Sequence, residues 1–256
     1  LEAARREAAE GGPGGLQPLH RHLPLQGEAS PAHPGVQVQG PLAEGLHRLL
    51  QEVVDRVPVP PGPGLDEEPA PGAGKEGSVA LVGQKYGGTS VGDLELIHKV
   101  AQRIAHYREK GHRLAAVVSA MGHTTDELIA LAKRVNPRPP FRELDLLTTT
   151  GEQVSVALLS MQLWAMGIPA KGFVQHQIGI TTDGRYGDAR ILEVNPARIR
   201  EALEQGFVAV IAGFMGTTPE GEITTLGRGG SDTTAVAIAA ALGAKECEIY
   251  TDTEGV

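Results

Sequence analysis

Apolar runs alternate with amphipathic segments from residue 79 to the end of the chain. Short apolar runs typical of buried strands occur at 79–82, 114–119, 170–174, 208–214 and 247–251. Helical spacing of apolar residues between them predicts helices near 93–110, 126–135, 143–166, 197–205 and 232–243. Strands that alternate with helices indicate an α/β fold whose mostly parallel sheet is covered on both faces.

Residues 1–78 have a different composition. They hold twelve of the eighteen prolines, and residues 59–64 and 69–74 are runs of proline and glycine. One patch, 42–57, has helical spacing but would be marginal as an isolated helix. We expect a Pro/Gly-rich extension that is disordered or not native. Because the chain begins with Leu1, an upstream extension, a processed precursor and a translation begun too early all stay open.

Charge and composition narrow the class of protein. The net charge of −8, without a basic stripe, argues against a nucleic-acid partner. A single cysteine, Cys247, excludes an internal disulfide and a cysteine-based metal site. The apolar run 207–214 is too short to span a bilayer, and no signal-peptide pattern is visible. The sequence predicts a soluble cytoplasmic protein without a membrane partner.

Residues 85–90, Lys-Tyr-Gly-Gly-Thr-Ser, have the composition of a phosphate cradle. Gly87 and Gly88 let backbone N–H groups approach an anion, and Lys85 adds a mobile positive charge. The helix predicted to follow would offer its positive end to the same anion. The segment is not a P-loop, and residues 227–232 break the G-x-G-x-x-G pattern at the last position.

Three other clusters, at 119–126, 148–152 and 224–232, combine glycine with polar residues. Arg228 lies between glycines, where its planar guanidinium could reach a carboxylate or phosphate. Ser231 and Asp232 begin a predicted helix and could serve only as caps. Roles without a ligand also stay open: Arg228 and Glu152 could simply be solvated, and Ser119 and Thr125 could be ordinary turn or cap residues. No spacing of histidines or carboxylates predicts a protein metal site.

The clusters together resemble the aspartate kinase family over about residues 79–256. The motifs that match in order are residues 85–91, 117–120, 151–152, 213–214 and 226–232, and residues 250–256 look like the strand and loop that reach the nucleotide. The resemblance implies the amino-acid kinase fold, a three-layer α/β/α sandwich, here its N-terminal part and incomplete at the C-terminus. It also implies transfer of the γ-phosphoryl group of ATP to the side-chain carboxylate of L-aspartate. The product, 4-phospho-L-aspartate, would feed lysine, threonine and methionine biosynthesis.

The resemblance also assigns roles to individual residues. Lys85 and Asp232 would be catalytic, with Arg228 clamping a substrate carboxylate and Glu152 pairing with the substrate ammonium. The other substrate-binding residues would be Thr125, Phe214, Gly229 and Ser231, and the nucleotide would contact Lys85, Gly87, Gly88, Thr89, Ser90, Thr251 and Asp252. ATP would carry the Mg²⁺, so that no protein metal ligand is expected. A homo-oligomer is implied for the full-length protein.

Other functions stay open from the sequence. One is a related enzyme of the same fold that phosphorylates glutamate, acetylglutamate, carbamate or a nucleotide. Another is a truncated fragment that binds substrate without turnover, because relatives continue beyond the motif at 250–256. A nicotinamide-dependent oxidoreductase is disfavoured by the missing dinucleotide fingerprint.

Overall fold

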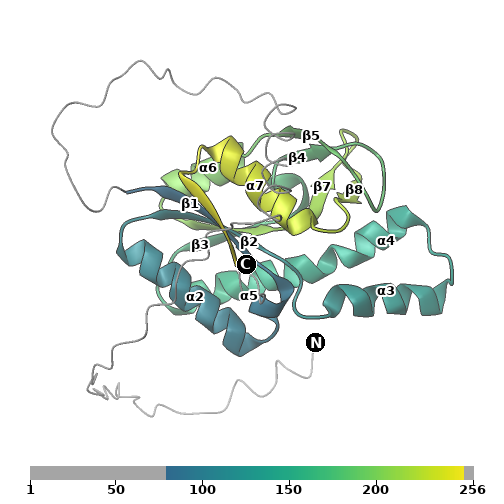
Figure 1. Cartoon of the computed structure of the whole chain (residues 1–256), viewed down its shortest axis with the longest axis horizontal. Coiled ribbons are helices and arrows are strands. Elements are labelled where there is room, and N and C mark those ends of the chain that lie inside the picture. Colours follow the sequence, from purple (N-terminus) through teal and green to yellow (C-terminus); the bar gives the residue numbers. More distant parts are fainter. Residues whose placement is uncertain (1–78, 251–256) are drawn as a thin grey trace, which may run out of the picture. The chain divides into compact units, whose positions relative to one another are not determined.

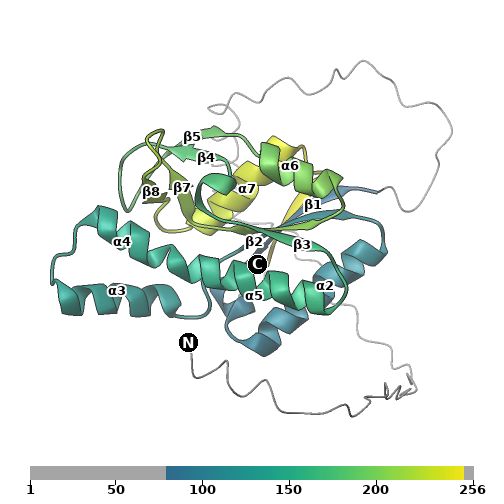
Figure 2. The same cartoon turned by 180° about the vertical axis from the view of Figure 1, so that it is seen from behind.

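The structure is a computed structural model that describes residues 79–250. The predicted extension 1–78 and the predicted nucleotide residues Thr251 and Asp252 therefore lie outside the described residues. The described residues form a five-stranded sheet, with helices on both of its faces, and a second, smaller sheet (Figures 1 and 2).

The main sheet is entirely parallel, in the order β3-β6-β2-β1-β9. Its strands are β1 Leu81–Tyr86, β2 Arg113–Val118, β3 Ala170–Phe173, β6 Val208–Ala212 and β9 Glu246–Tyr250. Each lies where the sequence predicts a strand, with ends that differ by a few residues. The largest difference is at β1, which continues through Gln84 and Lys85. Gln84 is fully buried, and its side-chain amide donates a hydrogen bond to Glu248, which compensates for its burial. The strand therefore continues through a polar residue, whereas the pattern of apolar residues alone predicts an earlier end.

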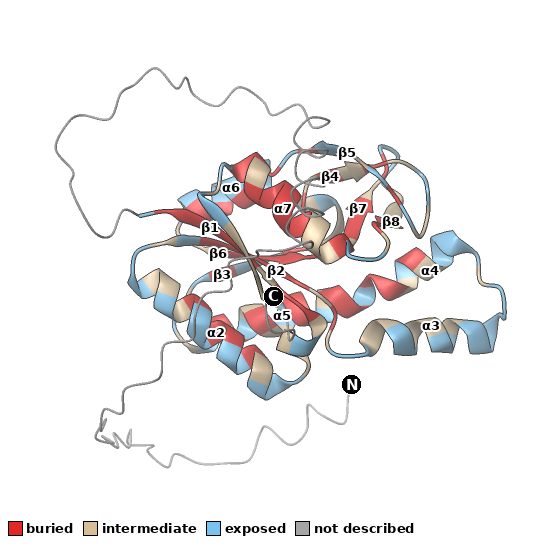
Figure 3. Ribbon diagram, viewed as in Figure 1, coloured by how far each residue is buried: buried red, intermediate tan, exposed pale blue. Residues whose placement is uncertain are grey.

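Helices cover both faces of this sheet, which confirms the predicted α/β/α layers. α2 and α5 lie on one face, and α6 and α7 lie on the other (Figure 1). The helices are α2 Leu94–Glu109, α3 Thr124–Val135, α4 Phe141–Thr148, α5 Thr150–Ala165, α6 Ala197–Glu204 and α7 Gly230–Leu242. Figure 3 shows the buried residues concentrated in the strands and on the sheet-facing sides of these helices.

The helix predicted over 143–166 is divided into α4 and α5 at Thr149. The hydroxyl groups of Thr148, Thr149 and Thr150 each donate to a backbone carbonyl one turn earlier, at 2.9, 3.2 and 2.6 Å. Such bonds compete with the helical ladder and bend helices. Thr149 nevertheless keeps helical dihedral angles, and its N–H donates to the carbonyl of Asp145, so α4 and α5 follow each other almost without interruption.

The smaller sheet is a feature that the sequence did not predict. Its strands are β4 Ile180–Thr182, β5 Ile191–Val194, β7 Met215–Thr217 and β8 Ile223–Thr225, in the order β5-β4-β7-β8. The strands are three or four residues long, too short for a hydrophobic period to show. They are stabilised by pairing between distant segments and by a buried hydrogen bond between the hydroxyls of Thr182 and Thr224, 2.6 Å apart.

Helix α7 packs closely on the centre of the main sheet. Six consecutive residues, 234–239, are buried, so almost no side of its middle turns faces solvent. A β-carbon on Gly83 of β1 would lie 3.0 Å from the β-carbon of Ala239. The close approach places the N-terminus of α7, where Ser231 and Asp232 lie, beside the carboxyl ends of the strands.

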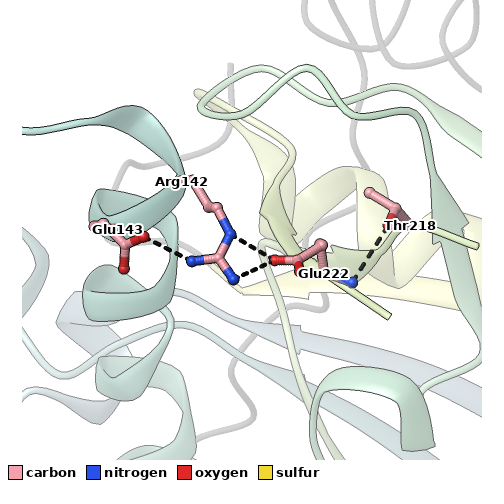
Figure 4. A network of polar contacts seen from close by, with 4 residues as sticks. All are labelled: Arg142, Glu143, Thr218 and Glu222. Carbon is pink, nitrogen blue, oxygen red and sulfur yellow. Dashed lines mark hydrogen bonds and ion pairs between the residues drawn. The ribbon is translucent and has the colours of Figure 1, made fainter. Parts of the chain in front are cut away.

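An exposed ion-pair network joins α4 to the turn between β7 and β8 (Figure 4). The guanidinium of Arg142 donates to Glu222 on one side and to Glu143 on the other, with N–O distances of 2.6 Å. These two carboxylates raise the pKa of Arg142. All three side chains are solvent-exposed, and exposed ion pairs contribute little to stability because water and salt screen them.

We therefore expect Arg142→Ala to leave the free energy of unfolding almost unchanged, despite the three short contacts. Chemical denaturation of the variant and the wild type in low and high salt measures the difference. A large loss, comparable to that of the buried Asp145→Ala on the same helix, would contradict this expectation.

Candidate active site

A cavity of about 320 Å³ opens at the carboxyl edge of the main sheet. The ends of β1, β2 and β6 and the first turns of α3, α5 and α7 surround it, as expected for a ligand site in a parallel α/β sheet. Nine predicted site residues line the cavity: Lys85, Gly88, Thr125, Glu152, Phe214, Arg228, Gly229, Ser231 and Asp232. The structure thus brings together motifs that are more than 140 positions apart in the chain.

Lys85 and Asp232 form an ion pair inside this cavity. The ammonium of Lys85, near the end of β1, lies 2.8 Å from Oδ1 of Asp232 in the first turn of α7. The Lys85 side chain is only 12% exposed, whereas that of Asp232 is 39% exposed. Asp232 therefore holds the ammonium at one position, which a flexible four-carbon side chain would not keep alone.

The glycine turn after β1 is followed by a helix whose N-terminus is capped by a side chain of the chain itself. The N–H of Gly87 donates to the carbonyl of Tyr250 at 3.4 Å, and a short 3-10 helix, Gly88–Val91, precedes α2. The carboxylate of Asp93 caps α2 by accepting from the N–H of Leu96 at 2.8 Å. The prediction that α2 offers a free positive end to a phosphate is therefore wrong, because the chain supplies its own anion there.

Gly88 lies against the loop that follows β2. A β-carbon on Gly88 would be 2.8 Å from the carbonyl oxygen of Ala120, and the N–H of Gly122 donates to the carbonyl of Gly88 at 3.0 Å. Only glycine allows this backbone-to-backbone contact. Gly87, Thr89 and Ser90, also predicted as nucleotide residues, belong to this turn but do not line the cavity.

Glu152 is a buried carboxylate that faces the cavity. It lies in the first turn of α5 and is 3% exposed. Its Oε1 accepts from the N–H of Ala120 at 3.1 Å, whereas Oε2 is buried without a hydrogen-bond partner among the described residues. Burial raises the pKa of Glu152 to about 7, although the Ala120 N–H partly offsets the shift. An unpartnered buried oxygen at the wall of a cavity suits a cationic ligand group.

We expect Glu152→Gln to stabilise the protein more at pH 8 than at pH 5. A carboxyl group whose pKa is raised on folding contributes stability below its unfolded pKa and loses it as the pH rises through the folded value, about 7. The substitution removes this loss, and between the two pH values the gain is on the order of 2 to 3 kcal/mol. Denaturation at both pH values measures it. Glu127→Gln, on the exposed side of α3, is the control, and an equal effect of Glu152→Gln at both pH values would contradict the expectation.

Phe214 lies where the chain turns from β6 into the small sheet. Its φ of +70° is in the left-handed region, which is costly for an aromatic residue. Its N–H donates to the hydroxyl of Thr234 on α7 at 3.1 Å. The preceding Gly213 packs on Ser231, since a β-carbon there would lie 2.6 Å from the serine hydroxyl. The predicted strand 208–214 therefore ends at residue 212, and Ser231 is packed in the cavity wall.

Arg228 lies at the mouth of the cavity, on the loop between β8 and α7. It is exposed, and no ion pair involves it within residues 79–250. Gly227 and Gly229 on either side have φ values of +74° and +77°, which glycine adopts without strain. The loop thus presents a guanidinium toward the same space that Glu152 and Lys85 face. Its exposure and its lack of an ion pair within residues 79–250 also fit the alternative in which Arg228 is only solvated, so its role as a carboxylate ligand stays a prediction.

The cavity also has five lining residues that the sequence analysis did not assign to it: Ser119, Ala120, Gly122, Gly227 and Gly230. All five lie within the glycine-containing clusters identified in the sequence, so membership of those clusters could have predicted that they line the cavity. No group of histidine, cysteine or acidic side chains suited to a metal ion occurs in the part of the chain that is described. Within the same residues, no helix is long and apolar enough to cross a membrane.

Comparison of the sequence with curated proteins identifies aspartokinases as relatives of this chain. An aspartokinase of Thermus thermophilus is 98% identical over 178 residues, which are 70% of this chain and 44% of that protein. An aspartokinase of Geobacillus stearothermophilus is 53% identical over the same shares. This chain thus spans less than half the length of these curated relatives.

Solved structures agree with the sequence comparison. The aspartate kinase of Synechocystis superposes with a TM-score of 0.60 at 52% identity, covering 68% of this chain and 29% of that one. Aspartokinase III of E. coli, in complex with aspartate and ADP, superposes with a TM-score of 0.58 at 26% identity, covering 69% of this chain and 50% of that one. The amino acid kinase family pattern matches residues 83–256. This chain belongs to the amino acid kinase family.

Proposed function

We propose that the protein of which these residues are part phosphorylates the side-chain carboxylate of L-aspartate with ATP, forming 4-phospho-L-aspartate. One observation carries the proposal: a single cavity is lined by two cationic side chains and by a buried carboxylate, one oxygen of which has no hydrogen-bond partner within residues 79–250. An amino acid with two carboxylates and an ammonium needs both signs of charge in its site. Relatives that share 53–98% of the aligned residues are aspartokinases, which supports aspartate over glutamate, acetylglutamate, carbamate or a nucleotide.

The chemistry requires positive charge more than a base. The side-chain carboxyl group of aspartate ordinarily titrates at about pH 4 and is already ionised near neutral pH, so no proton has to be removed from the nucleophile. Its oxygen attacks the γ-phosphorus of ATP, the bond from that phosphorus to the β–γ bridging oxygen breaks, and ADP leaves. The obstacle is repulsion between two anions, which positioned cations reduce as the transition state forms.

Lys85 is the group placed to counter that repulsion. The Asp232 carboxylate fixes its ammonium at the end of β1, where a β-carbon on Gly87 would lie 3.5 Å from it. We assign Lys85 to the transferred phosphoryl group and Asp232 to orienting it. Mg²⁺ would arrive with ATP and screen its β and γ oxygens.

The substrate is held between Arg228 and Glu152. We assign the Arg228 guanidinium to a substrate carboxylate, because its planar fork binds such a group through two hydrogen bonds. We assign the free Oε2 of Glu152 to the substrate ammonium, which would favour the ionised form of Glu152 near pH 7. Thr125, Phe214, Gly229 and Ser231 shape the remaining wall.

The biological setting forms part of the same proposal. Thr251 and Asp252 follow β9 and are assigned to the nucleotide together with Gly87, Thr89 and Ser90, by resemblance to the family. By the same resemblance to the family, we propose a cytoplasmic homo-oligomer that acts in lysine, threonine and methionine biosynthesis.

A phosphoryl-transfer assay tests the proposal directly. Hydroxylamine traps an acyl phosphate as a hydroxamate, so MgATP with L-aspartate should yield aspartyl hydroxamate and one ADP per turnover. Formation of ADP, the product common to all acceptors, is measured in parallel with L-glutamate, N-acetyl-L-glutamate, carbamate and a nucleoside monophosphate. Calorimetry measures the binding of L-aspartate to this chain. A faster reaction with one of the other acceptors, or no binding of aspartate, would reject the assignment.

A further inference from the structure

Asp145 is a buried carboxylate that no step of the proposed reaction uses. It lies on α4 and is 2% exposed. Its Oδ2 accepts the backbone N–H groups of Gly187 and Thr225, and its Oδ1 accepts the hydroxyl of Thr225, each at 2.9 Å. Burying a charge is costly unless hydrogen bonds replace its hydration. Here three hydrogen-bond donors replace the hydration of the carboxylate. Through them Asp145 links α4 to two other segments of the chain, at Gly187 and at Thr225.

Of the two segments that Asp145 binds, one leads into the Arg228 loop and the other packs against that loop. Thr225 ends β8, three positions before Arg228. Gly187 belongs to the loop that leads into β5 and packs against Gly227, where a β-carbon would lie 2.8 Å from Oδ1 of Asp188. The carbonyl of Thr225 accepts from the N–H of Ala189 at 2.8 Å. Asp145 therefore binds the last residue of β8, which leads into the Arg228 loop, and also the neighbouring loop that packs against Gly227.

The same helical rod that carries Asp145 also carries Glu152. The two residues are seven positions apart, which in helical geometry is two turns on one face and a rise of about 10 Å. The helical hydrogen bonds continue through Thr149, whose N–H donates to the Asp145 carbonyl and whose carbonyl accepts from Gln153. The continuous helix formed by α4 and α5 thus connects Asp145, which binds the start of the Arg228 loop, to Glu152.

We propose that Asp145 is a positioning residue that fixes the Arg228 loop at one separation from Glu152, so that the cavity fits an amino acid of the length of aspartate. The inference rests on the proposed function for its substrate. The physical reason for an aspartate at this position is that all three groups around it donate to it. An asparagine could keep the two backbone N–H bonds only by turning its amide nitrogen toward the Thr225 hydroxyl, which would then have to accept instead of donate.

Asp145→Asn tests this inference with nearly unchanged size. By calorimetry on this chain, the dissociation constant for L-aspartate should rise at least about tenfold, and the preference for L-aspartate over L-glutamate should fall. Hydrogen exchange of the amides in 225–230 should become faster, while exchange in β1 and β2 stays the same.

Neighbouring variants separate positioning from general destabilisation. Thr225→Val removes the hydroxyl donor but keeps both N–H bonds, so it should weaken aspartate binding less than Asp145→Asn, and Thr225→Ser should restore it. Thr182→Val removes the buried bond to Thr224 in the same small sheet. It should lower stability without changing the affinity for aspartate.

The outcomes distinguish this inference from the proposed function. If the wild type binds aspartate and Asp145→Asn binds it equally well, the inference is overturned and the function stands. If the wild type binds no aspartate, the function fails, and the exchange of 225–230 alone decides whether Asp145 anchors the loop. If Asp145→Asn does not fold, the Thr225→Val and Thr225→Ser pair decides, and equal affinities of the two would overturn the inference.

Discussion

Lys85→Ala should reduce turnover at least about a hundredfold, the largest effect expected from a single substitution in this protein. The alanine removes the ammonium that the proposed mechanism places against the transferred phosphoryl group. Loss of one preorganised group that stabilises developing charge typically costs about 3–4 kcal/mol of barrier. The substitution also leaves Asp232 unpaired in the cavity, where its negative charge would repel the phosphates. Both effects act in the same direction.

The measurement is the rate of hydroxamate formation at saturating MgATP and L-aspartate. Lys99→Ala is the matched control, because Lys99 is an exposed lysine that pairs with Glu95 one turn away on α2 and lies outside the cavity. It should retain the turnover of the wild type. Near-normal turnover of Lys85→Ala would remove the phosphoryl-contacting role, and with it the explanation of the ion pair with Asp232.

Arg228→Lys should mainly raise the Michaelis constant for aspartate, and Arg228→Ala should raise it further. Lysine keeps the charge but loses the planar fork that binds a carboxylate through two hydrogen bonds. Removing one partner of a charged hydrogen-bonded pair typically costs about 2–5 kcal/mol. That range corresponds to about thirtyfold or more for the alanine variant. Because Arg228 is exposed and has no ion-pair partner in residues 79–250, neither change should affect folding.

Initial rates over a range of aspartate concentrations, at saturating MgATP, separate the Michaelis constant from turnover. Arg134→Lys is the control, since Arg134 lies in the last turn of α3 on an exposed position outside the cavity. An unchanged Michaelis constant in Arg228→Lys would count against the carboxylate clamp. An effect confined to turnover would instead assign the guanidinium to the transition state.

Much of the main fold could be read from periodicity. All five strands of the parallel sheet and five of the six α-helical segments follow hydrophobic patterns that the sequence shows directly, and the sixth was merged with its neighbour. The glycine-containing motifs correctly located Lys85, Glu152 and Arg228 at one cavity. Lys85 lies near the end of β1, and the other two lie at the starts of α5 and α7. In a parallel α/β sheet the ligand site lies beyond the carboxyl ends of the strands, and here these helix starts meet the strand ends there.

Other features depended on contacts between distant segments and gave no local signal. The small sheet consists of three- and four-residue strands whose stability comes from their partners. Asp145 looks like an ordinary helical aspartate until Thr225, eighty positions later, is placed beside it. Asp93 directly precedes the apolar pattern of α2, and its side chain caps that helix. The same carboxylate occupies the helix end to which the sequence analysis assigned a phosphate.

The order of residues alone thus established a parallel α/β layer arrangement and the chemical groups available at its edge, since both follow from short-range patterns in the chain. Only the tertiary structure decided how these groups are paired: Lys85 with Asp232, Glu152 with an oxygen left free, and the Arg228 loop held by Asp145. Such pairing depends on distances of a few ångströms between residues far apart in sequence. Burial and hydrogen bonding set those distances, and a one-dimensional pattern does not encode them.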